Sequence, residues 1–297
     1  MKSRRRDSYL RHGGSTIFLR VPHDCLCRDA TVEAPSRGGQ EYGKERSILS
    51  DTIFHCMGRR VSLFVTCMVD QLFPKIGMAM ADVLEQVGCQ VDFPEDQTCC
   101  GQPAFNSGFR AEARTVARHF LDTFEDSETV VVPSGSCTAM ITHHFAELFH
   151  KEPETLARVH ALETRVWEFS TFLTQVAGVE DVGARLDRVV TFHDGCHGLR
   201  ELGVKAAPRR LLSHVRGLEL REMVPAEECC GFGGTFAVKF SELSGAMART
   251  KIDAIERTGA TTVVSCDPSC LMQIQGALSR AGSPIGTLHI AEVLASR

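Results

Sequence analysis

Cysteine is the residue type that points to chemistry in this sequence, because thiolates bind metal ions and iron–sulfur clusters. The chain of 297 residues holds 13 cysteines, and two of them begin Cys-Cys-Gly runs, at Cys99 and at Cys229. An odd total excludes complete internal pairing. Neighbouring cysteines form a disulfide only with strain, because that bond needs Cα atoms about 4.4–6.8 Å apart. Thiolates acting as metal ligands are therefore favoured over disulfides.

The cysteines recur in two halves of the chain at similar intervals. In the first half the intervals are 32 residues (67 to 99) and 37 residues (100 to 137). In the second half they are 33 residues (196 to 229) and 40 residues (230 to 270). Each half also opens with an apolar run, so we predict an internal duplication. The recurring residues are Cys67, Cys99, Cys100, Cys137, Cys196, Cys229, Cys230 and Cys270.

Strand and helix patterns alternate between these cysteines, which predicts parallel sheets with right-handed crossovers. The fold class that we expect is α/β. Two duplicated Rossmann-like lobes with parallel sheets, at 59–180 and 181–297, would be related by a pseudo-twofold axis. Strands are predicted at 61–66, 90–93, 129–132, 189–193, 218–221 and 261–265, and helices at 75–87, 110–124 and 241–257.

The opening segment differs from the rest in charge and composition. Residues 1–60 carry a net charge of +5 and the remainder −9. Residues 1–58 are rich in Arg, Gly and Ser and lack a sustained strand or helix period. We predict either a disordered extension or sequence outside the native protein, since Met57 could serve as a start. The charges are too mixed for a basic nucleic-acid arm. No run of about 18 apolar residues predicts a membrane span.

The cysteine positions follow predicted strands, and ligand sites in parallel α/β folds lie at the carboxyl ends of strands. The helices that come next offer N-terminal amides to an anion. An iron–sulfur cluster held by thiolates is such an anion. Each half offers four thiolates, with Cys266 as a further candidate in the second half. Zinc would also accept four sulfurs, although its sites usually contain Cys-x-x-Cys pairs, which this chain lacks. Iron–sulfur binding is favoured, and zinc stays open as the alternative.

The repeated Cys-Cys-Gly pattern resembles the cysteine-rich CCG domain. That domain occurs in the heterodisulfide reductase B subunit, the glycolate oxidase iron–sulfur subunit and the anaerobic glycerol-3-phosphate dehydrogenase C subunit. The runs 93–108, 229–236 and 289–294 look most like the lactate utilization protein A family. The resemblance covers about 61–297.

The resemblance implies a cytoplasmic iron–sulfur electron-transfer subunit of a complex that oxidises L-lactate to pyruvate, rather than a complete enzyme. Its partners would be the lactate utilization B and C proteins. Its cofactor would be one or two clusters, either [4Fe–4S] or a non-cubane relative. The chain lacks the ferredoxin run CxxCxxCxxxCP of the glycolate and glycerol-phosphate subunits. Two alternatives remain: a zinc-binding scaffold subunit, or an iron–sulfur subunit acting on glycolate, glycerol 3-phosphate or a heterodisulfide.

The sequence departs from the family pattern at the third cysteine position. The fuller CCG pattern ends in Cys-x-x-Cys. Here Ser134 takes the first place in one half, and Cys266 and Cys270 are one residue too far apart in the other. Whether both halves bind a cluster is therefore left open.

The run from His193 to Arg200 resembles the HxxCHxxR run of the same domain. His197 could donate a hydrogen bond to a cluster sulfur or move a proton. Its alternative is a structural hydrogen bond at a helix start. Arg200 could bind a substrate carboxylate, and its alternative is a surface ion pair.

Overall fold

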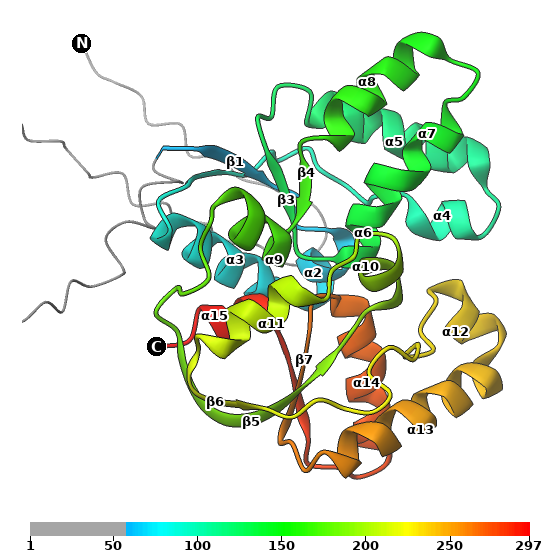
Figure 1. Ribbon diagram of the computed structural model, residues 1–297. Helices are drawn as coiled ribbons and strands as arrows, with labels where there is room; N and C mark the ends of the chain where they lie inside the picture. The colour runs from blue at the N-terminus through cyan, green and yellow to red at the C-terminus, as the bar shows by residue number, and fades with distance from the viewer. Residues whose placement is uncertain (1–57) are drawn as a thin grey trace, which may run out of the picture. The chain divides into compact units, whose positions relative to one another are not determined.

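The computed structural model describes residues 58–297 (Figure 1). The extension predicted for 1–58 lies, apart from Gly58, outside these residues. The described part contains two four-stranded sheets with strand orders β2-β1-β3-β4 and β6-β5-β7-β8, and every strand pair is parallel. The same strand order in both halves confirms the predicted duplicated α/β fold. We call the elements β1 to η3 lobe 1 and the elements β5 to α15 lobe 2; the predicted boundary at residue 180 falls in the connection between them.

Lobe 1 alternates strands with helices and includes two π-helical turns, η2 and η3. Its elements are β1 (Arg60–Leu63), α2 (Cys67–Leu72), α3 (Pro74–Gln86), β2 (Gln90–Asp92), α4 (Gln102–Asn106), α5 (Arg110–Thr123), β3 (Val130–Val132), α6 (Gly135–Ala139), η2 (Met140–His144), α7 (Phe145–Leu148), α8 (Pro153–Glu163), β4 (Val166–Glu168), α9 (Phe169–Thr171) and η3 (Phe172–Val176).

Lobe 2 repeats the plan with fewer helices. Its elements are β5 (Arg185–His193), α10 (Cys196–Arg200), α11 (Ala206–Ser213), β6 (Arg216–Leu220), α12 (Thr235–Lys239), α13 (Ser241–Arg257), β7 (Thr262–Ser265), α14 (Pro268–Arg280), β8 (Gly286–His289) and α15 (Ile290–Leu294). None of the described helices is long and apolar enough to cross a membrane.

Each sheet has a fourth strand, which the sequence pattern does not distinguish from the helix that follows it. Strands β4 and β8 have only three and four residues, and each passes directly into a helix. Their end residues cap those helices: Glu168 accepts from the Thr171 amide, and the His289 Nδ1 accepts from the Ala291 amide. Such short strand–helix units predict a single amphipathic segment, because neither period is repeated often enough to be recognised.

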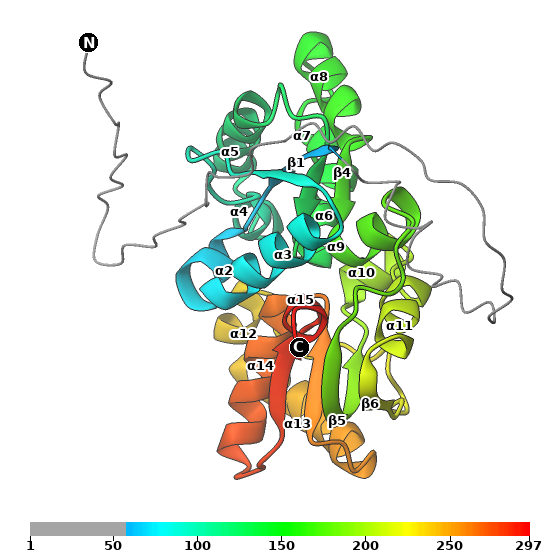
Figure 2. The same ribbon diagram turned by 90° about the vertical axis from the view of Figure 1, so that its left-hand side faces the viewer.

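An apolar core joins the two lobes. Helix α15 of lobe 2 lies against α3 of lobe 1 (Figures 1 and 2). Buried side chains from both lobes form one cluster there, including Val83, Leu84, Phe172 and Ile290. Further clusters belong to each lobe alone. Since burial of apolar area is the main favourable term in folding, the shared cluster holds the lobes in a fixed relation.

Polar contacts cross the same boundary. The Asp267 carboxylate of lobe 2 accepts from the Ser136 amide (2.9 Å) and the Ser134 hydroxyl (3.3 Å) of lobe 1. The His289 Nε2 donates to the Pro133 carbonyl oxygen at 2.8 Å. The segments that follow β3 and β7 therefore meet at the centre of the molecule, beside the cysteines that they carry.

Candidate metal centres

Four thiols of lobe 1 come together from three segments at the carboxyl end of the sheet. Cys67 begins α2, Cys99 and Cys100 lie between β2 and α4, and Cys137 lies in α6. The Sγ atoms of Cys67 and Cys99 are 3.6 Å apart, and those of Cys100 and Cys137 are 3.4 Å apart. Cys99 and Cys100 are also close enough to shift each other's pKa values. The sheet thus brings together the four lobe 1 cysteines that the sequence grouped.

The corresponding thiols of lobe 2 form a second group. Cys196 begins α10, Cys229 and Cys230 precede α12, and Cys270 lies in α14. The ligand atoms of Cys230 and Cys270 lie within 4.8 Å of each other, and Cys196 and Cys229, like Cys229 and Cys230, are close enough to shift each other's pKa values. Both groups therefore contain four neighbouring sulfurs with the same connectivity.

A backbone amide donates to one sulfur in each group. The Gly101 amide lies 3.4 Å from the Cys99 Sγ, and the Gly231 amide lies 3.4 Å from the Cys229 Sγ. Both glycines have left-handed backbones, with φ of 82° and 86°. That conformation explains the glycine after each cysteine pair, because other residues adopt it at a cost. It turns the amide back toward the preceding thiol, where N–H···S bonds stabilise negative charge.

Within each group, neighbouring thiols have pKa values that are shifted in opposite directions. Hydrogen bonds from Cys100, Cys67 and the Gly101 amide lower the pKa of Cys99 to about 3. Hydrogen bonds from Cys196, Cys230 and the Gly231 amide lower the pKa of Cys229 to about 2. The pKa values of the donating thiols Cys67, Cys100, Cys196 and Cys230 are raised by these same hydrogen bonds, by burial and by the neighbouring thiols. Like charges this close need a cation to be ionised together, and metal binding supplies one.

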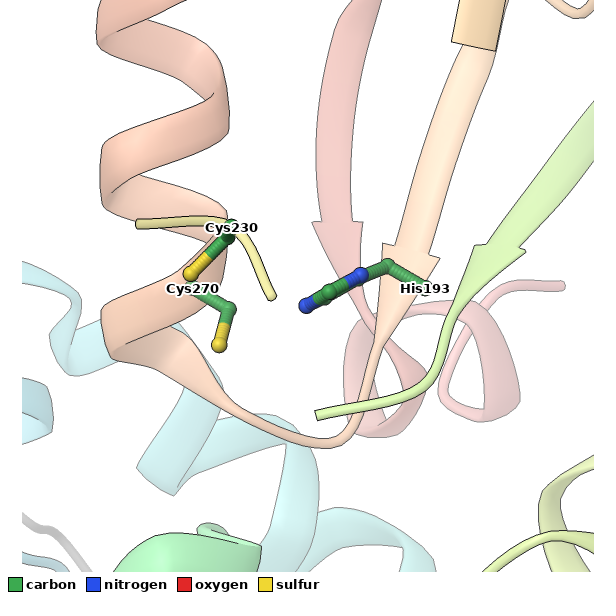
Figure 3. Close-up of side chains that lie close together, drawn as sticks. All are labelled: His193, Cys230 and Cys270. Atoms are coloured by element: carbon green, nitrogen blue, oxygen red, sulfur yellow. The ribbon is translucent and has the colours of Figure 1, made fainter. Parts of the chain in front are cut away.

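His193 adds an imidazole to the lobe 2 group. It ends β5 and is fully buried, and both ring nitrogens lack a hydrogen-bond partner among residues 58–297. Ligand atoms of His193, Cys230 and Cys270 lie within 4.8 Å of one another, with the ring directed at the two sulfurs (Figure 3). A buried polar group without a partner is costly, so this orphaned ring indicates space for a bound group. The sequence places His193 in a motif but gives no signal for this role.

Cys266 lies apart from the sulfur groups. Its Sγ is 3.8 Å from the Ser170 hydroxyl of lobe 1, and the charge of Glu168 acts on it. Burial, followed by the charge of Glu168, raises the pKa of this thiol well above its usual value. The structure thus separates Cys266 from the eight cysteines that it brings together.

His197 and Arg200 lie on α10 beyond Cys196. The Nδ1 of His197 is 2.7 Å from the Glu201 carboxylate, whose other oxygen is 3.1 Å from the Nε2 of His144 in lobe 1. The imidazole therefore makes a structural hydrogen bond, as the alternative to a chemical role expects. Arg200 is exposed, and no ion pair of the described chain includes it. Its exposed guanidinium is accessible to a ligand, and binding of a substrate carboxylate stays a prediction.

Comparison with known proteins identifies the relatives of this arrangement. The cysteine-rich CCG domain model matches twice, at residues 61–142 and 190–275. Lactate utilization protein A of Geobacillus kaustophilus is 48% identical over 238 residues, which cover 80% of this chain and 99% of that protein. The chain belongs to the lactate utilization protein A family. The Bacillus subtilis family member is 46% identical over 238 residues, covering 80% of this chain and all of its own.

A solved structure shares the fold at low identity. The crystal structure of a hypothetical protein from Helicobacter pylori aligns with a TM-score of 0.58 at 11% identity, over 80% of this chain and 48% of its own. The two matched segments of the CCG domain lie within the described residues, one beginning in each lobe.

Proposed function

We propose that this chain is a cytoplasmic iron–sulfur electron-transfer subunit of a complex that oxidises L-lactate to pyruvate. One observation carries the proposal: in each lobe four thiols from three segments converge, and a glycine amide donates to one of them. Clustered thiolates with N–H donors are the ligands that iron–sulfur clusters require. Family membership supports lactate as the substrate of the complex.

The proposed ligands are the eight grouped cysteines, four in each lobe. When bound, an iron–sulfur cluster supplies one-electron transfer. Those cysteines would hold the cluster, and the amides of Gly101 and Gly231 would stabilise its negative charge. Arg200, exposed on α10, would meet a substrate or partner carboxylate, and His197 would act beside it. The cluster type, [4Fe–4S] or non-cubane, belongs to this proposal.

The partners that we propose are the lactate utilization B and C proteins. Hydride or electron transfer from lactate needs a redox group, and the described chain has no Rossmann dinucleotide fingerprint. Electrons would therefore pass between this subunit's clusters and the centres of its partners.

Zinc is the second candidate, and one observation favours it. His193, Cys230 and Cys270 converge closely enough for one tetrahedral ion. A scaffold subunit with zinc would need no electron transfer, so metal analysis separates the two functions.

Anaerobic purification followed by iron, acid-labile sulfide and zinc quantitation and EPR tests the proposal. We expect more than two irons per chain with matching sulfide, and a smaller iron content in Cys100→Ser and in Cys230→Ser. Cys89→Ser is the matched control, because Cys89 is a buried cysteine outside both groups. One or two zinc ions without iron, or full iron content in both ligand variants, would overturn the proposal.

A further inference from the structure

The two lobes differ at one pair of equivalent positions beside the sulfur groups. Phe64 follows β1 and His193 ends β5, each three residues before the first cysteine of its lobe. The sheet registers make them equivalent, since the preceding residues pair with β3 and β7 at matching places. On the helices after the Cys-Cys-Gly runs, Phe120 and Lys251 each lie eleven residues beyond the N-cap phenylalanine of α5 or α13.

In lobe 1 this pair is apolar. Phe64 and Phe120 are buried and pack edge to face, with ring centroids 4.9 Å apart. The largest influences on the pKa values of the lobe 1 thiols are the other thiols, burial and backbone amides. The fold is therefore satisfied by two phenyl rings at these positions.

In lobe 2 the same pair is polar and fully buried. Within the part of the chain that the structure describes, neither ring nitrogen of His193 has a hydrogen-bond partner, and Lys251 has no exposed surface. The Lys251 ammonium donates to the carbonyl oxygens of Pro225 (3.4 Å) and Ala226 (3.1 Å) and contacts the Met223 sulfur at 3.8 Å. Buried lysines are rare and costly, and lobe 1 shows that the fold does not need one here.

Both polar groups act on the lobe 2 sulfurs. The His193 ring is directed at Cys230 and Cys270 (Figure 3). The charges of Glu228, Cys230 and Cys270 oppose the lowering of the Lys251 pKa by burial, and Lys251 in turn favours the thiolate of Cys270. The His193 ring thus faces the lobe 2 sulfurs, and the buried Lys251 influences them through its charge, whereas the equivalent places in lobe 1 hold phenyl rings.

We propose that His193 and Lys251 give the lobe 2 cluster a higher reduction potential than the lobe 1 cluster, so that lobe 2 holds the first electron. The inference rests on the proposed iron–sulfur function. One-electron reduction adds one negative charge to a cluster. A buried cation stabilises that charge by Coulomb attraction, and an N–H donor or a nitrogen ligand in place of sulfur acts in the same direction. The phenyl pair of lobe 1 offers neither.

Asp267 is a negative group that opposes this effect, since its charge raises the pKa of Cys196 and Cys270, and Glu228 and Asp194 are further negative groups near Lys251. Its carboxylate accepts hydrogen bonds from both lobes: from Ser134 and Ser136 of lobe 1 and from Ser269 of lobe 2. Those donors partly compensate the charge of the carboxylate. Lys251, in contrast, belongs to lobe 2 alone.

A redox titration of the anaerobically purified full chain tests the inference. Dithionite would be the one-electron reductant and EPR the readout, with Cys100→Ser and Cys230→Ser assigning each signal to a lobe. We expect two reduction steps, the lobe 2 step at higher potential. Lys251→Met should shift the lobe 2 equilibrium at least tenfold toward the oxidised form, which is about 59 mV for a one-electron couple. Phe120→Met, the equivalent change in lobe 1, is the matched control.

Two further variants keep the test falsifiable if Lys251→Met does not fold. His193→Phe, which installs the lobe 1 residue, should lower the same potential, and His193→Gln, which keeps an N–H donor, should restore part of it. Equal potentials in the wild type, or variants that keep full iron content and leave the lobe 2 potential unchanged, would overturn the inference. A wild type without iron would instead overturn the proposed function.

Discussion

Gly135 of α6 and Gly198 of α10 join the lobes through their backbones. A Cβ atom on Gly135 would lie 2.9 Å from the Gly198 Cα, closer than side chains approach a backbone carbon. The reciprocal atom on Gly198 would lie 3.7 Å from the Gly135 Cα, an ordinary van der Waals distance. Because α6 carries Cys137 and α10 begins with Cys196, this contact fixes the distance between the two sulfur groups.

Gly135→Ala should therefore destabilise the protein where Gly198→Ala does not. We expect the first change to lower the free energy of unfolding by about 1–3 kcal/mol through overpacking. The second should be neutral or slightly stabilising, since alanine is favoured over glycine in a helix by about 1 kcal/mol. Urea denaturation measures both, and equal midpoints for the two variants would contradict the close contact.

The glycines of the two Cys-Cys-Gly runs should also respond unequally. Alanine at either position would adopt a left-handed backbone at a cost of about 1–2 kcal/mol. At Gly231 the added Cβ would also lie 2.7 Å from the Ser244 carbonyl oxygen, whereas at Gly101 its nearest neighbour would be 3.5 Å away. Gly231→Ala should therefore lose more stability than Gly101→Ala, by roughly 1–3 kcal/mol. Thermal or urea unfolding of both variants decides; the opposite order would refute this packing.

His289 should make the stability of the protein depend on pH. Burial lowers its pKa to about 4 from an ordinary 6.5, against the hydrogen bond to Pro133. Because the pKa is lower in the folded state than in the unfolded chain, the protein has its full stability above pH 6.5. It loses stability as the pH falls toward 4, since the unfolded chain then binds the proton more readily. Between pH 8 and pH 5 the loss should be about 2 kcal/mol.

His289→Gln is the control for this pH dependence, because an amide can still donate to the Pro133 carbonyl oxygen without titrating in this range. Between pH 8 and pH 5 the free energy of unfolding of the wild type should fall by about 2 kcal/mol more than that of His289→Gln. Parallel pH profiles would show that His289 does not titrate differently on folding.

Sequence patterns could predict the duplication and the eight grouped cysteines, because two copies of one fold place their cysteines at similar intervals along the chain. They could not predict the partners of His193 and Lys251. Lys251 lies at a core position of α13, between Ala248 and Ile252, and a lysine in a helix is ordinarily read as exposed. Its burial becomes visible only when lobe 2 is laid over lobe 1 and Phe120 marks the equivalent place.

Cys266 shows the same limit at a single residue. Ser134 and Asp267 both cap the helix that carries the last grouped cysteine, three residues before Cys137 and Cys270. Cys266 is thus equivalent to Pro133. The one-residue excess in its spacing to Cys270 places it before the capping residue Asp267, outside the helix that carries the grouped cysteine. Chain numbering alone does not say which residue begins a helix, because the cap depends on a side-chain hydrogen bond.

Cys266→Ala and Cys270→Ala should consequently differ in metal content. Both thiols are 7% exposed, so truncation removes a similar amount of buried side chain from each position. The Cys270 sulfur lies within 4.8 Å of the Cys230 sulfur in the lobe 2 group, whereas that of Cys266 contacts Ser170. Cys270→Ala should lose the iron of lobe 2, and Cys266→Ala should keep the full wild-type content. Iron and sulfide assays on the two purified variants measure this, and a loss of iron in Cys266→Ala would make that thiol a ligand.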